Sequence, residues 1–274
     1  MGVSLSINDI KNVTGEMARY KGMDYTGFNF SFLKRRLGHV FSELRIRRLP
    51  QFIERLEDES FRELVHYHMA VNVTEMFRDP GFWRSLRTHV LPGFRGKTLR
   101  IWFPDTTSGE EIFSLVIILK EDGLLDMASM VCHHPSVQKC QEVAQGEFQA
   151  GNEETNLNNY RRLEENDQFE EYFSRPQGQI KFRDELLKNI EFISQWFLDY
   201  DEEEKFDLII FRNSTINLTL QRRDEVIHKV AEHLEPGGFL AMGVKERLPD
   251  SLSGTLVTVD EKESIYRKPE SQNK

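Results

Sequence analysis

Cysteine, long apolar runs and clustered glycines are all scarce in this sequence of 274 residues. Its two cysteines, Cys132 and Cys140, are too few for a disulfide framework, and this favours a cytoplasmic protein. Because no run of about eighteen apolar residues occurs, no membrane span is expected. The N-terminus also lacks the charged start and apolar core of a signal peptide.

What remains is a globular composition with an uneven distribution of charge. Hydrophobic residues make up 39% of the chain and aromatic residues 11%, which is enough for a real core. Residues 1–100 carry 17 Lys and Arg against 11 Asp and Glu, whereas the rest of the chain carries 19 against 34. The sequence therefore predicts a basic front part that meets an acidic partner, followed by an acidic body. The basic excess is too small to indicate a nucleic acid as that partner.

The first hundred residues predict helices. Apolar side chains recur at helical spacing over residues 28–44 and again over 52–65, with Pro50 and the cluster that starts at Asp58 as boundaries. Six basic residues gather around the first helix and its end: Lys34, Arg35, Arg36, Arg45, Arg47 and Arg48. They form either a docking surface for an acidic partner or an ordinary solvated face.

After a junction near residues 91–96, strand-like and helical stretches alternate. Strands are expected at 99–103, 130–132, 190–192, 206–211 and 239–244, and a closing hairpin at 255–267. Helices are expected at 110–120, 135–145 and 218–234, the last ended by a Pro-Gly-Gly sequence at 236–238 that supplies a glycine C-cap. Residues 146–175 are expected to be helix and loop. The alternation predicts an α/β fold with a doubly wound, mostly parallel sheet.

These patterns divide the chain into three parts. We expect a small all-α domain at residues 1–90, an α/β domain at 91–268 and a disordered tail at 269–274. Within the α/β domain, residues 101–111 predict a first strand, a polar loop and a helix that opens with Glu110 and Glu111. A cofactor is expected across the carboxyl end of that strand, although Gly109 is the only glycine in a loop where a dinucleotide fingerprint needs several.

Five segments, taken in order, closely resemble the chemotaxis receptor methyltransferases of the CheR type. They are SFLKRRL at 31–37, NVTEMFRDP at 72–80, SGEEIFS at 108–114, FDLIIFRN at 206–213 and PGG at 236–238. The resemblance implies a helical domain followed by a Rossmann-like class I methyltransferase domain that binds S-adenosylmethionine (SAM). Members of the family methylate glutamate side chains on chemoreceptor helices. A carboxylate is already nucleophilic and a sulfonium methyl already activated, so such an enzyme mainly aligns and desolvates the two.

The resemblance also implies the residues of the site. Carried over position by position, it assigns six cofactor-binding residues: Asn72, Thr74, Arg78, Glu111, Arg212 and Asn213. Arg78 is also the residue assigned to catalysis, as a fixed positive charge near the cofactor's carboxylate or the incoming glutamate.

Four positions depart from the family's pattern. Cys132 stands where the family has an acidic residue that ends the second strand and holds both ribose hydroxyls, and a thiol is a poor acceptor. Asp105 adds bulk and negative charge where the family has a small residue. Trp196 replaces an Asn of the adenine region, and Asn217 replaces an aromatic residue. The loss of one charge-assisted contact of this kind costs about 1.5–3 kcal/mol, or about tenfold to a hundredfold in affinity.

Because the departures cluster in the adenosine half of the cleft, the sequence favours a pseudoenzyme. On this hypothesis the protein binds SAM weakly or not at all, and it acts by binding helices of a chemoreceptor or another acidic signalling protein. Two alternatives stay open: an active SAM-dependent protein-glutamate O-methyltransferase, and a remodelled cleft that takes another small ligand. No metal is expected, since the adjacent His133 and His134 of one strand point to opposite faces. The sequence leaves open the receptor and the oligomeric state.

Overall fold

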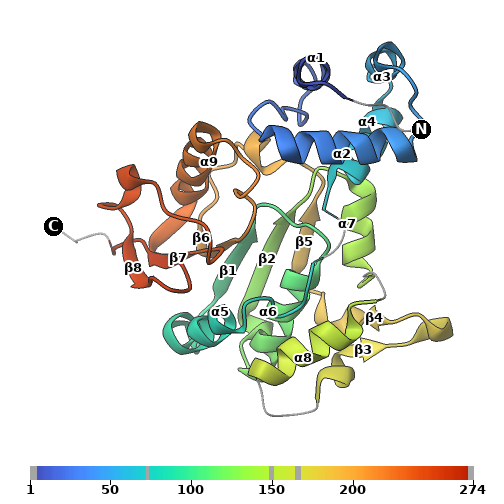
Figure 1. Cartoon of the computed structure of the whole chain (residues 1–274). Helices are drawn as coiled ribbons and strands as arrows, with labels where there is room; N and C mark the ends of the chain where they lie inside the picture. The colour runs from blue at the N-terminus through green and yellow to red at the C-terminus, as the bar shows by residue number, and fades with distance from the viewer. Residues whose placement is uncertain (1–4, 72–73, 148–150, 164–167, 271–274) are drawn as a thin grey trace.

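The computed structural model describes residues 5–71, 74–147, 151–163 and 168–270. A central sheet is surrounded by helices, and the group α1 to α4 lies together beyond one end of the strands (Figure 1). The helices of the described ranges are α1 Ile7–Met17, α2 Phe30–Glu43, α3 Leu49–Arg55, α4 Glu59–Met69, α5 Pro80–Ser85, α6 Glu110–Glu121, α7 Val137–Ala144, α8 Glu153–Leu163 and α9 Leu220–Glu232. None of these helices has the length and apolar character needed to cross a membrane.

Seven strands form the main sheet in the order β5-β2-β1-β6-β7-β9-β8. Their bounds are β1 Leu99–Phe103, β2 Ala128–His133, β5 Ile190–Ile193, β6 Phe206–Phe211, β7 Leu234–Met242, β8 Val257–Asp260 and β9 Ile265–Arg267. The strands from β5 to β7 in this order pair in parallel, and β9 is antiparallel to both β7 and β8. The predicted parallel sheet and the predicted C-terminal hairpin are therefore confirmed.

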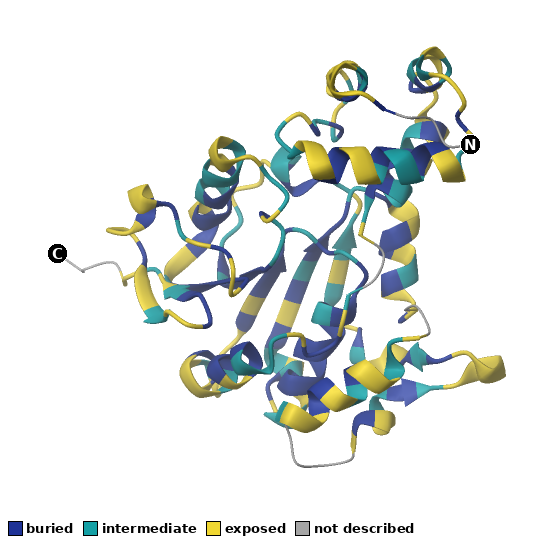
Figure 2. Ribbon diagram, viewed as in Figure 1, coloured by how far each residue is buried: buried dark blue, intermediate teal, exposed yellow. Residues whose placement is uncertain are grey.

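The strands are buried on both faces. Along β1, Ile101 packs into the core that contains α6, whereas Trp102 packs into the core that contains α9. Dark blue residues fill the centre of the sheet, and the exposed residues lie on the outer helices and at strand ends (Figure 2). Since parallel strands end at the same edge, the loops after β1, β2 and β6 are brought together there.

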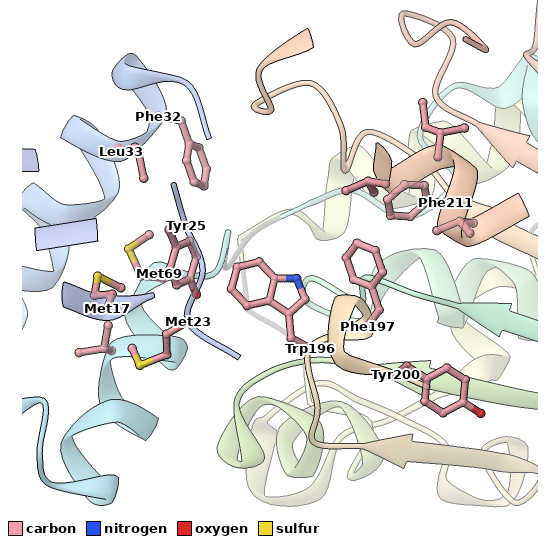
Figure 3. Close-up of a cluster of buried hydrophobic side chains, with 14 of the residues drawn as sticks. Met17, Met23, Tyr25, Phe32, Leu33, Met69, Trp196, Phe197, Tyr200 and Phe211 are labelled. Atoms are coloured by element: carbon pink, nitrogen blue, oxygen red, sulfur yellow. The ribbon is translucent and has the colours of Figure 1, made fainter. Parts of the chain in front are cut away.

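The helical front part begins its helices with side-chain caps. Asn29 caps α2 by accepting a hydrogen bond from the Phe32 backbone, and Asp58 caps α4 at the predicted boundary. Apolar residues of α2 that were predicted from their spacing are buried: Phe32, Leu33, Leu37, Val40 and Phe41. They share one core with Trp196 and Phe197 of the sheet domain (Figure 3).

Residues 76–91 belong to the other core. Met76, Phe77, Phe82, Trp83 and Leu91 pack with β1 and α6 rather than with α1 to α4. The division of the chain at residue 90 stays a prediction. In the expected tail, Glu270 forms an ion pair of 2.8 Å with Arg267, and residues 271–274 lie outside the described ranges.

Two predictions of local structure are wrong. Helix α9 ends at Glu232 with His233 as its C-cap, and the Pro-Gly-Gly sequence lies inside β7. Between the pairs Phe206–Leu234 and Leu208–Phe239 the register with β6 shifts by three residues, and Gly237 takes φ +85°, so these glycines serve an irregularity of the strand instead of a helix end. Residues 146–175 also contain a strand, β3 Phe173–Ser174, which pairs with β4 Lys181–Phe182. A strand of two residues is too short to show the alternation of apolar and polar residues by which strands are predicted.

Candidate functional site

A cavity of about 330 Å³ lies at the edge where β1, β2 and β6 end. Its floor is the loops that follow those strands, and its far wall comes from the helical part through Tyr25, Phe28 and Phe32. The two sides are joined by backbone hydrogen bonds from Asn29 N to Asn217 O (2.7 Å) and from Thr219 N to Gly27 O (2.9 Å). The cavity is thus bounded by both parts of the chain, at the strand edge where the sequence predicts a cofactor.

The loop after β1 has the predicted strand-loop-helix form. Gly109 takes φ +93°, and a Cβ there would lie 2.8 Å from Val143, so both the conformation and the space require glycine. Glu110, which opens α6, is buried and accepts hydrogen bonds from Ser108 Oγ (2.5 Å) and Thr74 Oγ1 (2.8 Å). Burial raises the pKa of Glu110, and these two donors oppose that rise. The hydrogen bond to Glu110 therefore holds Thr74 against the loop after β1.

Arg212 is the centre of the site. Its side chain is fully buried, and its two terminal nitrogens donate to Glu111 (2.6 Å) and Asp79 (2.8 Å). Its guanidinium also lies over the Phe82 ring at 3.9 Å from the ring centre. Burial raises the pKa of Glu111, and Arg212 opposes that rise. The predicted residues Glu111 and Arg212 thus form one charge cluster with Asp79, which the prediction did not include.

Glu246 is a second residue of the site region that the sequence analysis did not predict. This buried carboxylate accepts hydrogen bonds from the backbone of Asn213 (2.7 Å), Thr215 (2.7 Å) and Gly243 (2.7 Å), and one from Thr215 Oγ1 (2.5 Å). It holds Asn213 in a left-handed conformation with φ +60° and so fixes the loop that follows β6. Nothing in the local sequence marks this glutamate among the 45 acidic residues of the chain.

Two of the three residues carried over from the segment 72–80 lie at the cavity. Thr74 and Arg78 both line it, and Asn72 lies outside the described residues. Arg78 is exposed and makes no ion pair with any residue that the structure describes. A free guanidinium at the rim suits the predicted contact with a carboxylate.

Cys132 does not line the cavity. Its side chain is fully buried in the core with Met130 and Ala128, because alternate residues of β2 share one face of the sheet. His134 continues that face beyond the end of the strand, and it is the residue that lines the cavity. No carboxylate occurs between Cys132 and Ser136, so the acidic residue expected there is absent under either alignment.

His134 meets the cavity as a neutral imidazole. The Ser136 backbone donates to its Nδ1 at 2.9 Å, which leaves the ring proton on Nε2. Burial, and to a lesser extent Lys139, lower the pKa of His134 to about 3. The ring offers one N–H donor and cannot accept from the two hydroxyls of a ribose.

The other three departures from the family pattern all line the cavity. Asp105 is half-buried at the end of β1, and Asn217 lies in the loop after β6. Trp196 is buried, with its ring centre 4.7 Å from that of Tyr25 and 6.2 Å from that of Phe28 (Figure 3). Trp196 is therefore both a wall of the cavity and a contact between the two parts of the chain.

The six basic residues predicted as a docking surface do not form a uniform set. Lys34, Arg35, Arg45, Arg47 and Arg48 are exposed. Arg36 instead donates to the carbonyls of His68, Met69 and Ala70 at the end of α4, with 3.0 Å between its Nε and Met69 O. A cation at the carbonyl end of a helix stabilises that end, so Arg36 has a structural role.

The fold and the position of the cavity are those of a class I SAM-dependent methyltransferase. The profile of the family described as "CheR methyltransferase, SAM binding domain" matches residues 72–264. The chain belongs to this CheR methyltransferase family, which confirms the family resemblance and SAM as the family's cofactor.

Several relatives cover most of the chain. It is 25% identical to the putative methyltransferase Cher3 of Pseudomonas putida, over 81% of this chain and 82% of that protein. It is also 25% identical to a chemotaxis protein methyltransferase of Listeria monocytogenes, over 90% of this chain and 93% of that protein. Among solved structures, the N-methyltransferase NodS of Bradyrhizobium japonicum with S-adenosyl-L-homocysteine (SAH) covers 85% of this chain and matches over all of its own, at 11% identity and a TM-score of 0.41. That likeness is too low to inform the site.

The residues of the cavity would fit some groups of SAM and not others. Arg78 would supply a cation for the methionine carboxylate, and Glu111 an acceptor for its ammonium. On the ribose side, the segment after β2 offers the single donor of His134 in place of a bidentate acceptor. The cavity would therefore suit the methionine end of the cofactor, but this segment would leave the ribose hydroxyls without a bidentate acceptor.

Proposed function

We propose that this protein is a CheR-family signalling protein that binds SAM weakly or not at all and acts by binding acidic helices of a chemoreceptor or another signalling protein. The observation that carries the proposal is the neutral ring of His134 at the end of β2. A carboxylate accepts from both ribose hydroxyls, whereas this ring has its one acceptor nitrogen occupied by Ser136.

Replacing His134 with aspartate is expected to strengthen SAM binding by about tenfold to a hundredfold, the effect of one charge-assisted contact. The new carboxylate can still accept from the Ser136 backbone, as Asp does in a turn two residues long, so the loop is expected to keep its shape. The measurement is calorimetric titration with SAM and with SAH. The wild-type chain should give no saturable heat at micromolar concentrations.

The matched control is His134→Asn, which offers an acceptor without charge and should gain little. Thermal melting of the three proteins establishes that each is folded. Micromolar binding of SAM by the wild-type chain, with no gain in His134→Asp, would refute weak binding as we propose it.

The exposed basic residues of the front part support the second half of the proposal. Reversing the charge of Lys34 and Arg48 to glutamate is expected to weaken binding to a purified helical fragment of a chemoreceptor by about tenfold at low salt. Both residues are exposed and lie away from the cavity lining. The control reverses Arg95 and Lys97, two exposed cations outside α1 to α4. Equal loss in both double variants would mean that net charge alone matters.

An active protein-glutamate O-methyltransferase is the second candidate. It is favoured by Thr74, Arg78 and the Arg212–Glu111 pair, which the family resemblance assigns to the site and which all line the cavity. Transfer of a labelled methyl group from SAM to chemoreceptor glutamates, abolished in Arg78→Ala, would establish this candidate. Absence of transfer by His134→Asp as well as by wild type would dismiss it.

A further inference from the structure

Asp105 brings a carboxylate into the cavity. The charged side chains that line the cavity are three carboxylates and three guanidinium groups: Glu75, Asp105 and Glu111, and Arg35, Arg78 and Arg212. Arg212 is already committed to Asp79 and Glu111. Among the residues that the structure describes, none forms an ion pair with Asp105.

The surroundings of Asp105 increase the cost of this charge. Burial raises the pKa of Asp105, a hydrogen bond with Ser214 opposes that rise, and the neighbouring Glu246 adds to it. A half-buried carboxylate of this kind is stabilised when a positive charge enters the cavity beside it.

The wall of the cavity suits a ligand with a flat ring. Trp196 and Tyr25 lie side by side (Figure 3), with ring centres 4.7 Å apart at an angle of 52°. Both line the cavity together with Phe28. Aromatic faces also favour cations that come close to them. A ligand that combines an aromatic ring with a positive centre therefore meets complementary groups on both sides.

We infer that Asp105 determines charge specificity in this cavity: it favours adenosyl compounds with a sulfonium or ammonium centre over analogues that are uncharged at that centre. The inference rests on the proposed function, since it takes the cavity to be an adenosyl site of reduced affinity. For cationic ligands alone, the attraction to Asp105 partly compensates for the affinity that is lost because His134 cannot accept hydrogen bonds from the ribose.

The test compares three ligands that differ in one place. SAM has a sulfonium, SAH has an uncharged thioether, and sinefungin has an ammonium group at that position without the transferable methyl. Each is titrated calorimetrically into the wild-type chain and into His134→Asp, where tighter binding extends the measurable range. We expect SAM and sinefungin to bind about tenfold more tightly than SAH. In Asp105→Asn, in both backgrounds, the three affinities should fall within about twofold of one another.

The matched control is Asp199→Asn, which removes the same charge from a groove on the far side of Trp196. It should preserve the preference for cationic ligands. Three results would each overturn the inference. The first is equal binding of SAM and SAH to the chain that retains Asp105, and the second is an equal loss of both affinities in Asp105→Asn. The third is no binding of any of the ligands in the His134→Asp background. If the wild-type chain binds SAM tightly and still prefers SAM to SAH by about tenfold, the proposed weak binding is refuted and the role of Asp105 stands.

Discussion

Replacing Arg212 with alanine is expected to destabilise the protein by about 3–5 kcal/mol, the cost of removing one partner from a buried ion pair. The side chain of Arg212 is fully buried, and its loss leaves the carboxylates of Glu111 and Asp79 without their cation. It also removes the contact with the Phe82 ring. Urea unfolding, followed by tryptophan fluorescence, measures the free energy of unfolding directly.

Two companion variants separate charge from packing. Arg212→Lys keeps the charge but cannot form both hydrogen bonds at once, so an intermediate loss is expected. Arg267→Ala removes an exposed cation that pairs with Glu270, and it should cost less than about 1 kcal/mol. If Arg212→Ala proves no more harmful than Arg267→Ala, the charge cluster does not support the site as described.

Much of the fold was predictable because each element is locally consistent. The strands at 99–103 and 206–211 are apolar except for Arg100 and Asp207 near their starts, which is typical of parallel strands buried on both faces. The helix that begins at Glu110 is equally clear from its apolar run and acidic first turn. The Pro-Gly-Gly sequence was misread because a glycine pair fits a helix end and a strand bulge equally well, and only the pairing with β6 distinguishes them.

The site was only partly predictable. Arg212 and Glu111 are 101 residues apart in the chain, yet the family pattern brings both to the cavity, where they form a hydrogen bond of 2.6 Å. Cys132 ends the strand predicted at 130–132, whereas β2 runs to His133 and His134 is the residue that reaches the cavity. Glu246 was missed because its role depends on the backbone of Asn213, which is 33 residues away.

Arg36 was grouped with the docking residues because the sequence does not show which side chains the fold brings together. In the sequence it is one of three consecutive basic residues, and a helix of that composition is typical of a solvated or docking face. The fold turns one of the three toward the end of α4, where three carbonyls surround it. Charge patterns in a sequence indicate that a face is basic, but packing decides which of its cations are available to a partner.

Lowering the pH from 7 to 5 is expected to remove several kcal/mol of stability, because three buried histidines must be neutral in the folded chain. Burial is the main cause that lowers the pKa of His66 and of His133 to about 4 and that of His134 to about 3. Each is below its ordinary value of 6.5, so below that pH the unfolded chain binds more protons than the folded chain. Stability then falls by about 1.4 kcal/mol per pH unit for each histidine. The raised pKa values of Glu110 and Glu111 act in the opposite direction and reduce the total.

Urea unfolding at pH values from 7.5 to 5 measures this slope, and His133→Phe tests its origin. The side chain of His133 is fully buried, and its ring packs against that of Tyr200 with ring centres 4.6 Å apart. Phenylalanine keeps the ring and removes the titration, so the loss between pH 6.5 and 5 should shrink by about 2 kcal/mol. His89→Gln replaces an exposed histidine and should leave the slope unchanged. If the free energy of unfolding of the wild-type chain stays constant over this pH range, water reaches these rings. In that case His134 is not kept neutral, and the proposed weak binding of the ribose loses its basis.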